Sequence, residues 1–308
     1  GFASEVFNCS APDTGNMEVF QRYATLEQKE QWLRPLMNGE IRSAFLMTEP
    51  AVASSDATNI QCELKRDGDD YVINGRKWWS SGAGDPRCQV AILMGKTNPE
   101  KPKHSQQSQI LVPLDAKGVN ILRPLTVFGY DDAPHGHMEI ELKDVRVPAS
   151  NLLLGEGRGF EIAQGRLGPG RIHHCMRTIG AAEAALEAMC RPITTRGAFG
   201  KTIAENQGLQ WVMADMKKDI TAARALVHRA AMTMDAGLPA TMDCSIAKCF
   251  ASDTAVQHTA NAVQIFGGSG YIRGFEVERL YRDAKITQIY EGTNQIQRNI
   301  IASDLLKA

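Results

Sequence analysis

The chain has 308 residues, which exceeds the usual length of a single domain and favours two or more packed units. Hydrophobic residues make up 43% of it and charged residues 22%, and the formal net charge is -1. A chain so close to neutral has no single-sign field that would attract nucleic acid or an anionic membrane, so polyanion-binding proteins are disfavoured.

The seven cysteines are scattered along the chain and include no Cys-x-x-Cys pair. This usage is typical of reduced, buried thiols and disfavours a disulfide framework or a zinc site, so we expect no metal. No apolar run reaches the roughly 18 residues of a membrane span, and the first residues lack a secretory signal. We expect a soluble intracellular protein, cytoplasmic in a bacterium and mitochondrial or peroxisomal in a eukaryote.

The first 43 residues contain one clear helix signal. Thr25 and Gln28 form a capping box, the run LEQKEQWLRPLMNG follows from position 26, and Gly39 is expected to end the helix. Pro35 is expected to bend its last turn.

Residues 44–150 change to short β-rich runs separated by turn residues. The expected strands read CELKR, YVI, RKWW, QVAILM, SQILVPL and HMEIELKDV. Asn74-Gly75 predicts a type I′ hairpin between the second and third of them. The pattern predicts an antiparallel sandwich or barrel, and the lack of alternating strands and helices disfavours a parallel dinucleotide-binding sheet.

Residues 151–308 have a helical pattern. From Leu209 onward apolar residues recur every three or four positions, and Gly237 ends this run. A second long helix is expected over about 243–266, and another near 160–190. Three long helices predict an antiparallel bundle.

Several short motifs could carry chemistry but are commoner as plain structure. The glycine-rich runs GEGRGF (155–160) and GGSGYIRG (267–274) lack a phosphate-loop spacing and are typical of turns and caps. Two histidine pairs are more often surface or helix-start residues than metal ligands: His135 with His137, and His173 with His174, which is expected to open a helix.

Two further segments, AFLMTEPAVASSDA (44–57) and NGRKWWSSG (74–82), are more informative together than alone. Taken singly, the first is a strand followed by a turn, and the second is a hairpin whose tryptophans fill the core. Together they place hydroxyl groups, small residues and a large indole on one sheet. This combination suits an aromatic cofactor stacked at the sheet edge.

Seven blocks occur in one order nearly from end to end: MTEPAVASSD, GRKWWSSGA, DVRVPASNLLLGEGRGFEIA, GRIHHCMRTIGAAEAAL, TRGAFGKTI, QIFGGSGY and YRDAKITQIYEGTNQIQR. In these blocks the chain resembles the acyl-CoA dehydrogenases, flavoproteins that oxidise acyl-CoA thioesters to enoyl-CoA. The runs SEVFNCSAPDTGNMEVF and LGPGRIHHCMR are most similar to the branch of human acyl-CoA dehydrogenase family members 10 and 11.

The resemblance implies an α+β multidomain fold of the acyl-CoA dehydrogenase type. Residues 1–43 would be the remnant of a truncated N-terminal helical domain, 44–150 a middle antiparallel β sandwich or barrel, and 151–308 a C-terminal antiparallel helical bundle. The family's dimer or dimer-of-dimers tetramer is also implied, because a flavin site of this family is shared between subunits.

Within ITQIYEGTNQIQR, Glu291 has no neighbouring carboxylate. In the resembling family the glutamate of this segment is the base that removes the α-proton of the thioester. Burial among apolar side chains would raise the pKa of such a carboxyl toward neutrality. Its backbone N–H and a flavin hydroxyl would stabilise the enolate-like oxygen, Gly292 would leave room for that approach, and FAD would take the hydride. Some family members carry the base at the position of Gly170, which here has no side chain.

The same resemblance assigns further contacts block by block. The expected flavin-facing residues are Phe45, Met47, Thr48, Trp79 and Ser81, together with Thr293 and Gln295. The expected contacts to the FAD of a neighbouring subunit are Arg196, Phe199, Gln264 and Gly268. Substrate contacts are expected at Ser55 for the CoA moiety and at Gly170, Arg171, His173 and Gly292 near the acyl group.

Arg171, His173 and His174 suggest a finer hypothesis, a polar or phosphorylated acyl group of the 4-hydroxyacyl type. An electron-transfer flavoprotein is the implied electron acceptor. An acyl-CoA oxidase that uses oxygen, a non-catalytic paralogue of the same fold, and a flavin enzyme acting on a small substrate without CoA remain as alternatives.

Overall fold

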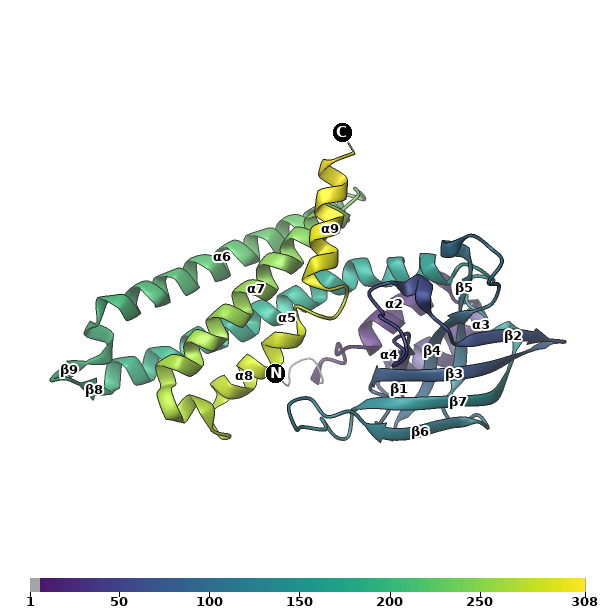
Figure 1. Cartoon of the computed structure of the whole chain (residues 1–308), viewed down its shortest axis with the longest axis horizontal. Helices are drawn as coiled ribbons and strands as arrows, with labels where there is room; N and C mark the ends of the chain where they lie inside the picture. Colours follow the sequence, from purple (N-terminus) through teal and green to yellow (C-terminus); the bar gives the residue numbers. More distant parts are fainter. Residues whose placement is uncertain (1–5, 308) are drawn as a thin grey trace. The chain divides into compact units, whose positions relative to one another are not determined.

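A computed structural model describes residues 6–307 of the chain. The chain divides into two compact units, residues 1–167 and residues 168–308, and each is described by itself. Figure 1 shows the order of the helices and strands along the chain. The division into three domains at positions 44 and 151 stays a prediction.

The first unit opens with α2 (Asp13–Tyr23), α3 (Leu26–Gln28), a π-helical turn (Lys29–Leu33) and α4 (Arg34–Met37). The predicted capping box is confirmed, because the Thr25 hydroxyl accepts from the Gln28 N–H and the Gln28 side chain accepts from the Thr25 N–H. Gly39 ends the run with a φ of 74°. Pro35 lies in the first turn of α4, so the departure from α-helical geometry comes before it, in the π-helical turn.

The strands of the first unit form one seven-stranded sheet of order β1-β4-β2-β3-β7-β6, with β5 also paired to β4. Their bounds are β1 Arg42–Leu46, β2 Glu63–Asp67, β3 Asp70–Ser81, β4 Cys88–Lys96, β5 Gln107–Pro113, β6 Val119–Pro124 and β7 His137–Pro148. The sheet is not wholly antiparallel as predicted, because β1 and β2 both pair with β4 in parallel. The β2–β3 hairpin intervenes between β1 and β4, which allows the chain to return in the same direction.

The predicted hairpin at Asn74-Gly75 is wrong, because β3 runs through both residues without a turn. The β2–β3 turn lies instead at Gly68, where φ is 62°. Gly75 is required for a different reason. A Cβ at this position would lie 2.8 Å from the Cys62 side chain and 2.9 Å from its Cα, so only glycine leaves room for Cys62, the residue before β2.

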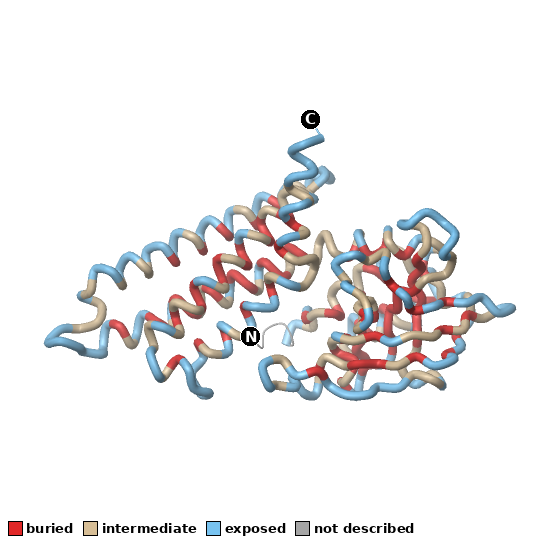
Figure 2. The backbone as a smooth tube through the Cα atoms, viewed as in Figure 1, coloured by how far each residue is buried: buried red, intermediate tan, exposed pale blue. Residues whose placement is uncertain are grey.

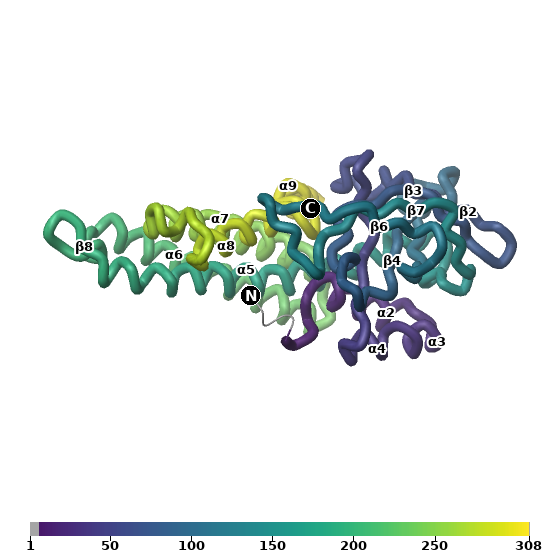
Figure 3. The backbone as a smooth tube through the Cα atoms, turned by 90° about the horizontal axis from the view of Figure 1, so that it is seen from below, coloured from purple at the N-terminus to yellow at the C-terminus, as the bar shows by residue number. Residues whose placement is uncertain are grey.

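The helices α2 to α4 cover one side of this sheet, as Figure 3 shows. Phe20 and Leu36 of the helices pack with Ile92 of β4 and Leu111 of β5. The next residue of β4, Leu93, belongs to a separate buried cluster, because successive side chains of a strand point to opposite faces. Figure 2 shows the buried parts of this unit in red, and the burial is nearly continuous along β4 and β5.

The second unit is the predicted antiparallel helical bundle. Its elements are the later part of α5 (Gly159–Thr195), the short strands β8 (Gly197–Ala198) and β9 (Lys201–Thr202), α6 (Gln207–Asp235), α7 (Thr241–Phe266), α8 (Glu276–Ile286) and α9 (Asn294–Leu305). Gly237 and Gly267 end α6 and α7 with positive φ, as expected. His173 and His174 do not open a helix, because they lie well inside α5.

Helices α6 and α7 run side by side in Figures 1 and 3. Their core is built from the periodic positions, and Met216, Ile220 and Ala223 of α6 are buried with Ala247 and Ala251 of α7. Small residues on α7 let the two backbones approach closely. Among residues 6–307 no helix is both long enough and apolar enough to cross a membrane.

None of the seven cysteines is in a disulfide, but they are not all buried as predicted. Cys62, Cys88, Cys175 and Cys244 are buried, whereas Cys9 and Cys190 are exposed and Cys249 is intermediate. Burial raises the pKa of Cys62 to about 11 and the pKa of Cys175 to about 12, so both are poor nucleophiles.

Candidate active site

Glu291 lies on the acid loop, which we define as residues 289–293 between α8 and α9 of the second unit. Glu291 has a φ of 56° and Gly292 a φ of 88°. Two consecutive residues in the left-handed region turn the chain sharply before Thr293, whose hydroxyl caps α9 by accepting from the Ile296 N–H. A left-handed conformation is unfavourable for glutamate, and such strain is typical of functional positions.

Two side chains hold the backbone of the acid loop. Arg171 donates from Nε to the carbonyl oxygen of Glu291 at 3.2 Å. Gln297 donates from Nε2 to the carbonyl oxygens of Glu291 and Gly292, at 3.2 and 3.1 Å. Arg171 is 5% exposed, and its burial lowers its pKa while the charge of Glu291 acts in the opposite direction. These donors offset the strain of the Glu291 backbone.

The Glu291 carboxylate faces α5. His174 Nε2 lies 3.5 Å from Glu291 Oε1, and each side chain is only 11% exposed. The His174 ring packs on Tyr290 with 4.1 Å between the centroids, and burial raises the pKa of Tyr290. A Cβ on Gly170 would lie 3.1 Å from Glu291 Oε2, so the glycine leaves space for the carboxylate.

The structure therefore brings together four predicted site residues, Gly170, Arg171, Glu291 and Gly292. His173, the neighbouring predicted contact, is half-buried on α5. Its pKa is lowered mainly by this burial. The sequence did not predict Gln297, and it predicted His174 only as a residue near a polar acyl group, not as a neighbour of the Glu291 carboxylate. The helical spacing of Gly170, Arg171 and His174, which places them on one side of α5, was the available signal.

A second group of polar residues anchors the start of α9. Lys248 Nζ donates to Asn294 Oδ1 at 2.7 Å, and Asn294 Nδ2 donates to Ser252 Oγ at 2.9 Å and to Asp253 Oδ1 at 2.7 Å. Lys248 is 2% exposed, and burial lowers its pKa to about 8. No short motif signals this network, because its members come from two helices that are far apart in the sequence.

In the first unit, the predicted flavin-facing residues come from β1, the segment after it, and the end of β3. Phe45 lies on β1 beneath the Arg166 guanidinium, which is 4.2 Å from the ring centroid. Met47 and Thr48 follow β1 and are half-buried. The Trp78 N–H donates to the Thr48 carbonyl oxygen at 3.0 Å, which joins the two segments.

A β-bulge re-aims Trp79. The pairing of β3 with β7 shifts register between Lys77 and Ser80, and Trp79 has a φ of 53° within this bulge. Its side chain is 42% exposed. The interpretation in which both tryptophans fill the core is therefore wrong for Trp79. The bulge breaks the alternation of side chains between the two faces of the sheet, and the Trp79 side chain is exposed.

The conformation of this segment is held by a buried ion pair between Lys77 and Glu49. Lys77 Nζ donates to Glu49 Oε1 at 2.7 Å and to the carbonyl oxygens of Met47 and Met94 at 3.0 and 2.7 Å. Glu49 accepts in addition from the N–H groups of Gln61 and Cys62. The glutamate of the Thr-Glu-Pro motif is thus a structural anchor for the residues before it.

The remaining predicted contacts are mostly exposed. Ser55 lies in an exposed turn. In the second unit Arg196 donates to the Phe266 carbonyl oxygen at 3.1 Å, and Phe199 is fully exposed with a φ of 53°. The other predicted contacts of this unit are exposed at Gln264, Gly268 and Gln295 and half-buried at Thr293.

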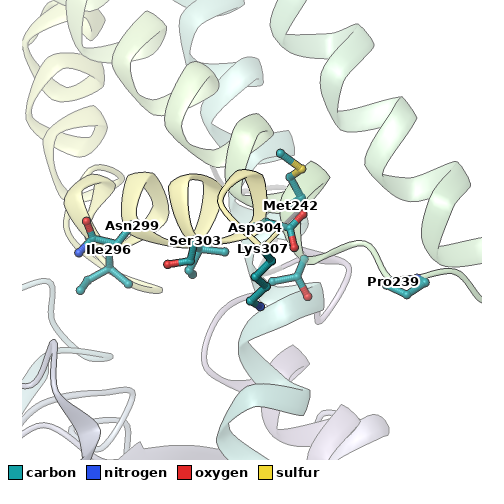
Figure 4. Close-up of a pocket in the computed structure, with 9 residues that line it drawn as sticks. Pro239, Met242, Ile296, Asn299, Ser303, Asp304 and Lys307 are labelled. Carbon is teal, nitrogen blue, oxygen red and sulfur yellow. The ribbon is translucent and has the colours of Figure 1, made fainter.

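A pocket of about 440 Å³ lies elsewhere on the second unit, between α9 and the start of α7. Figure 4 shows Ile296, Asn299 and Ser303 projecting from α9 on one side of it, with Met242 and Lys307 nearby. None of the predicted site residues lines this pocket.

Comparison with known proteins bears on both units. Residues 44–145 match the family model of the acyl-CoA dehydrogenase middle domain, and residues 157–306 match that of the acyl-CoA dehydrogenase C-terminal domain. Acyl-CoA dehydrogenase family member 11 of Gallus gallus is 50% identical over 98% of this chain. Family member 10 of Mus musculus is 49% identical over 99% of it.

The chain spans only 39% of the length of the first of these relatives and 29% of the second. Among solved structures, an acyl-CoA dehydrogenase homologue from Mycobacterium abscessus is 46% identical, with a TM-score of 0.97. That match covers 99% of this chain and 76% of the other. The two domain matches together cover most of the sequence, and the chain therefore belongs to the acyl-CoA dehydrogenase family.

Proposed function

We propose that this protein catalyses the FAD-dependent α,β-dehydrogenation of acyl-CoA thioesters to 2-enoyl-CoA. The observation that carries the proposal is the acid loop, where a mostly buried glutamate is held in a left-handed backbone conformation by Arg171 and Gln297. Such a constrained carboxylate has the position and the chemistry of a general base.

In this proposal Glu291 removes the α-proton of the thioester. The carboxylate gains the proton while the electron pair of the broken C–H bond moves toward the carbonyl group. The Glu291 backbone N–H donates to the thioester oxygen, where negative charge develops, and the fixed loop keeps this donor in place. Gly170 and Gly292 keep side chains away from the carboxylate and the loop backbone.

The residues of the first unit fit a flavin. Trp79 presents an exposed indole at a bulge, and the Met47–Thr48 segment beside it is fixed by the Lys77–Glu49 pair. When bound, FAD accepts the hydride that leaves the β-carbon. We assign Phe45, Met47, Thr48, Trp79 and Ser81 to its binding from this unit, and Thr293 and Gln295 from the acid loop and α9.

We assign Arg196, Phe199, Gln264 and Gly268 to the FAD of a neighbouring subunit, in a dimer or a dimer of dimers. The full exposure of Phe199 supports this assignment, because an aromatic side chain with no packing in its own chain is typical of an interface.

The finer substrate proposal has two parts. Ser55, in its exposed turn, contacts the CoA moiety, and the polar side chains of Arg171, His173 and His174 on α5 favour a polar or phosphorylated acyl group over a plain one. Replacing both histidines by alanine should lower the ratio of turnover on 4-phosphorylated to plain acyl-CoA. An unchanged ratio would exclude this part alone.

Anaerobic mixing of the FAD-loaded protein with a panel of acyl-CoA thioesters tests the main proposal. We expect the flavin absorbance to fade with at least one thioester and the product to be a 2-enoyl-CoA. Glu291→Gln should retain FAD but lose bleaching by a factor of about 10³ or more, since the base is removed without a change of shape. Equal bleaching by wild type and variant would contradict the role of Glu291.

The electron acceptor is tested by reoxidation of the reduced protein. We propose an electron-transfer flavoprotein, so reoxidation should be slow in oxygen alone and fast when that protein is added. Fast reoxidation by oxygen would identify an acyl-CoA oxidase instead. FAD binding without any thioester-dependent bleaching would indicate a non-catalytic paralogue or a flavin enzyme that acts on a small substrate without CoA.

A further inference from the structure

Ser81, His137 and Asp132 form a continuous hydrogen-bonded chain in the first unit. Ser81 Oγ lies 2.8 Å from His137 Nδ1, and His137 Nε2 lies 3.1 Å from Asp132 Oδ2. Ser81 and His137 are register partners across β3 and β7, and Asp132 comes from the loop before β7. Both ring nitrogens of His137 are therefore engaged.

The order of the groups determines the direction of the hydrogen bonds. The Asp132 carboxylate can only accept, so in the tautomer that satisfies both hydrogen bonds the His137 ring carries its proton on Nε2. Nδ1 is then an acceptor, and the Ser81 hydroxyl donates its proton to it. The lone pairs of Ser81 Oγ are thereby left to accept a hydrogen bond from any group bound on its other side.

The chain ends at the proposed flavin site. Ser81 follows the bulge that turns Trp79 outward, and the rings of Trp79 and His137 are 6.1 Å apart. His135 lies edge-on to His137 at 6.3 Å. His137 is 23% exposed and Asp132 is 45% exposed, so the far end of the chain lies toward the protein surface.

We propose that Asp132 and His137 are positioning residues that make Ser81 a hydrogen-bond acceptor toward the flavin and so favour its reduced state. This inference rests on the proposed function. A reduced isoalloxazine ring carries more N–H donors than an oxidised one, so an acceptor beside the ring stabilises the reduced form and a donor stabilises the oxidised form. A freed serine hydroxyl can rotate and donate.

The same three residue types also occur in hydrolytic triads, which gives a different reading of the geometry. In that reading Ser81 is a nucleophile activated by His137. The Ser81 neighbourhood favours the flavin reading instead, because the hydroxyl stands beside Trp79 on the surface that the family uses for its cofactor. Hydrolysis of p-nitrophenyl acetate is the direct measurement that separates the two readings.

The test is the midpoint potential of bound FAD, measured by reductive titration against a reference dye. His137→Phe keeps a ring beside Trp79 but removes both nitrogens. We expect it to lower the reduced-to-oxidised ratio at fixed potential at least tenfold, which is about 30 mV for a two-electron couple. Asp132→Asn, at a half-exposed position, should shift the potential in the same direction by less. His104→Phe, which removes an exposed histidine of the same unit, should not shift it.

A double-mutant cycle separates the proposed relay from a general structural effect. In a Ser81→Ala background His137→Phe should no longer shift the potential, because the hydroxyl through which it acts is gone. The inference would be overturned if His137→Phe shifted the potential equally in the Ser81→Ala background. It would also be overturned if His137→Phe alone left the potential unchanged. Esterase activity that is lost in Ser81→Ala would also overturn it.

The outcome for the proposed function is read separately in the same samples. If the protein binds FAD and its flavin is bleached by thioesters, but His137→Phe leaves the midpoint potential unchanged, only this inference is refuted. A protein that never binds FAD refutes the proposed function first, through the absence of flavin absorbance.

Discussion

Arg171 donates a hydrogen bond from Nε to the backbone carbonyl oxygen of Glu291, 120 residues later in the chain. The bond joins Arg171, a buried residue of α5, to Glu291, the non-glycine residue of the acid loop that has a left-handed backbone conformation. Arg171 therefore acts on the backbone of the proposed base, whereas His174 lies against its carboxylate.

We expect Arg171→Leu to destabilise the protein by about 1.5–3 kcal/mol, the usual range for a hydrogen bond to a charged donor, and to lower turnover. Arg171→Lys should not restore either property, because an ammonium group cannot reproduce the position of Nε. Urea unfolding and steady-state rates measure the two effects. Gln297→Leu removes the second donor to the same oxygen, so the double variant should be non-additive, and strict additivity would contradict a shared role.

Gly292→Ala should disturb the acid loop more than backbone strain alone predicts. A Cβ at this position would lie 2.6 Å from Gln297 Nε2, at a φ of 88°. Gly129 has a similar φ of 90° with no atom within 4 Å of its Cβ position, so Gly129→Ala measures the strain alone, about 1 kcal/mol. Unfolding free energies of the two variants should differ by a further 1 kcal/mol or more, by analogy with overpacking elsewhere. Equal costs would show that Gln297 moves aside freely.

Lys77→Met should be among the most damaging substitutions in the first unit. It leaves Glu49 without its ion-pair partner in a site where the two side chains are 0% and 4% exposed. Removing one partner of such a pair costs about 3–5 kcal/mol. Thermal unfolding should show the loss, and FAD affinity should fall with it, because Lys77 also holds the Met47 carbonyl oxygen.

The matched control for this pair is Arg34→Ala. Arg34 and Glu30 form an ion pair at the same 2.7 Å separation, but their side chains are 68% and 66% exposed. Solvent screens such an exposed pair, so Arg34→Ala should destabilise the protein far less than Lys77→Met does. If Arg34→Ala costs as much as Lys77→Met, burial is not the reason for the strength of the Lys77–Glu49 pair.

The pH dependence of stability should report Lys248. Burial lowers the pKa of Lys248 from an ordinary value of 10.5 to about 8, so between these values the folded state binds fewer protons than the unfolded state. Stability from this group therefore rises with pH across that window and is constant below it. Urea titrations of wild type and Lys248→Met from pH 7 to 10.5 should show a difference that grows in favour of wild type above pH 8. A difference independent of pH would contradict the assignment.

Local patterns along the chain predicted much of the secondary structure. The capping box at Thr25, the ends of α6 and α7 at Gly237 and Gly267, and most of the strands follow from caps, glycine stops and alternating apolar residues. These features depend on neighbours within one or two turns, so the sequence displays them directly. Glu291 was identified in the same way, through a short block that resembles a known family.

Other features required contacts between distant parts of the chain. Asn74-Gly75 has the sequence of a hairpin turn, yet it lies inside β3, where neighbouring strands pair on both sides and Gly75 leaves room for Cys62 just before β2. The parallel pairing of β1 with β4 and the outward turn of Trp79 depend likewise on strand partners that a local pattern does not name.

The sequence by itself determined the three long helices α5, α6 and α7, most of the strands, and the proposed base and cofactor residues, because periodicity, caps and family blocks are local properties. Only the tertiary structure decided that Arg171 and Gln297 hold the Glu291 backbone, that His174 faces its carboxylate, and that His137 meets Ser81. The physical reason is that a hydrogen bond or an ion pair depends on distances of a few ångström between side chains, which the fold sets and sequence separation does not.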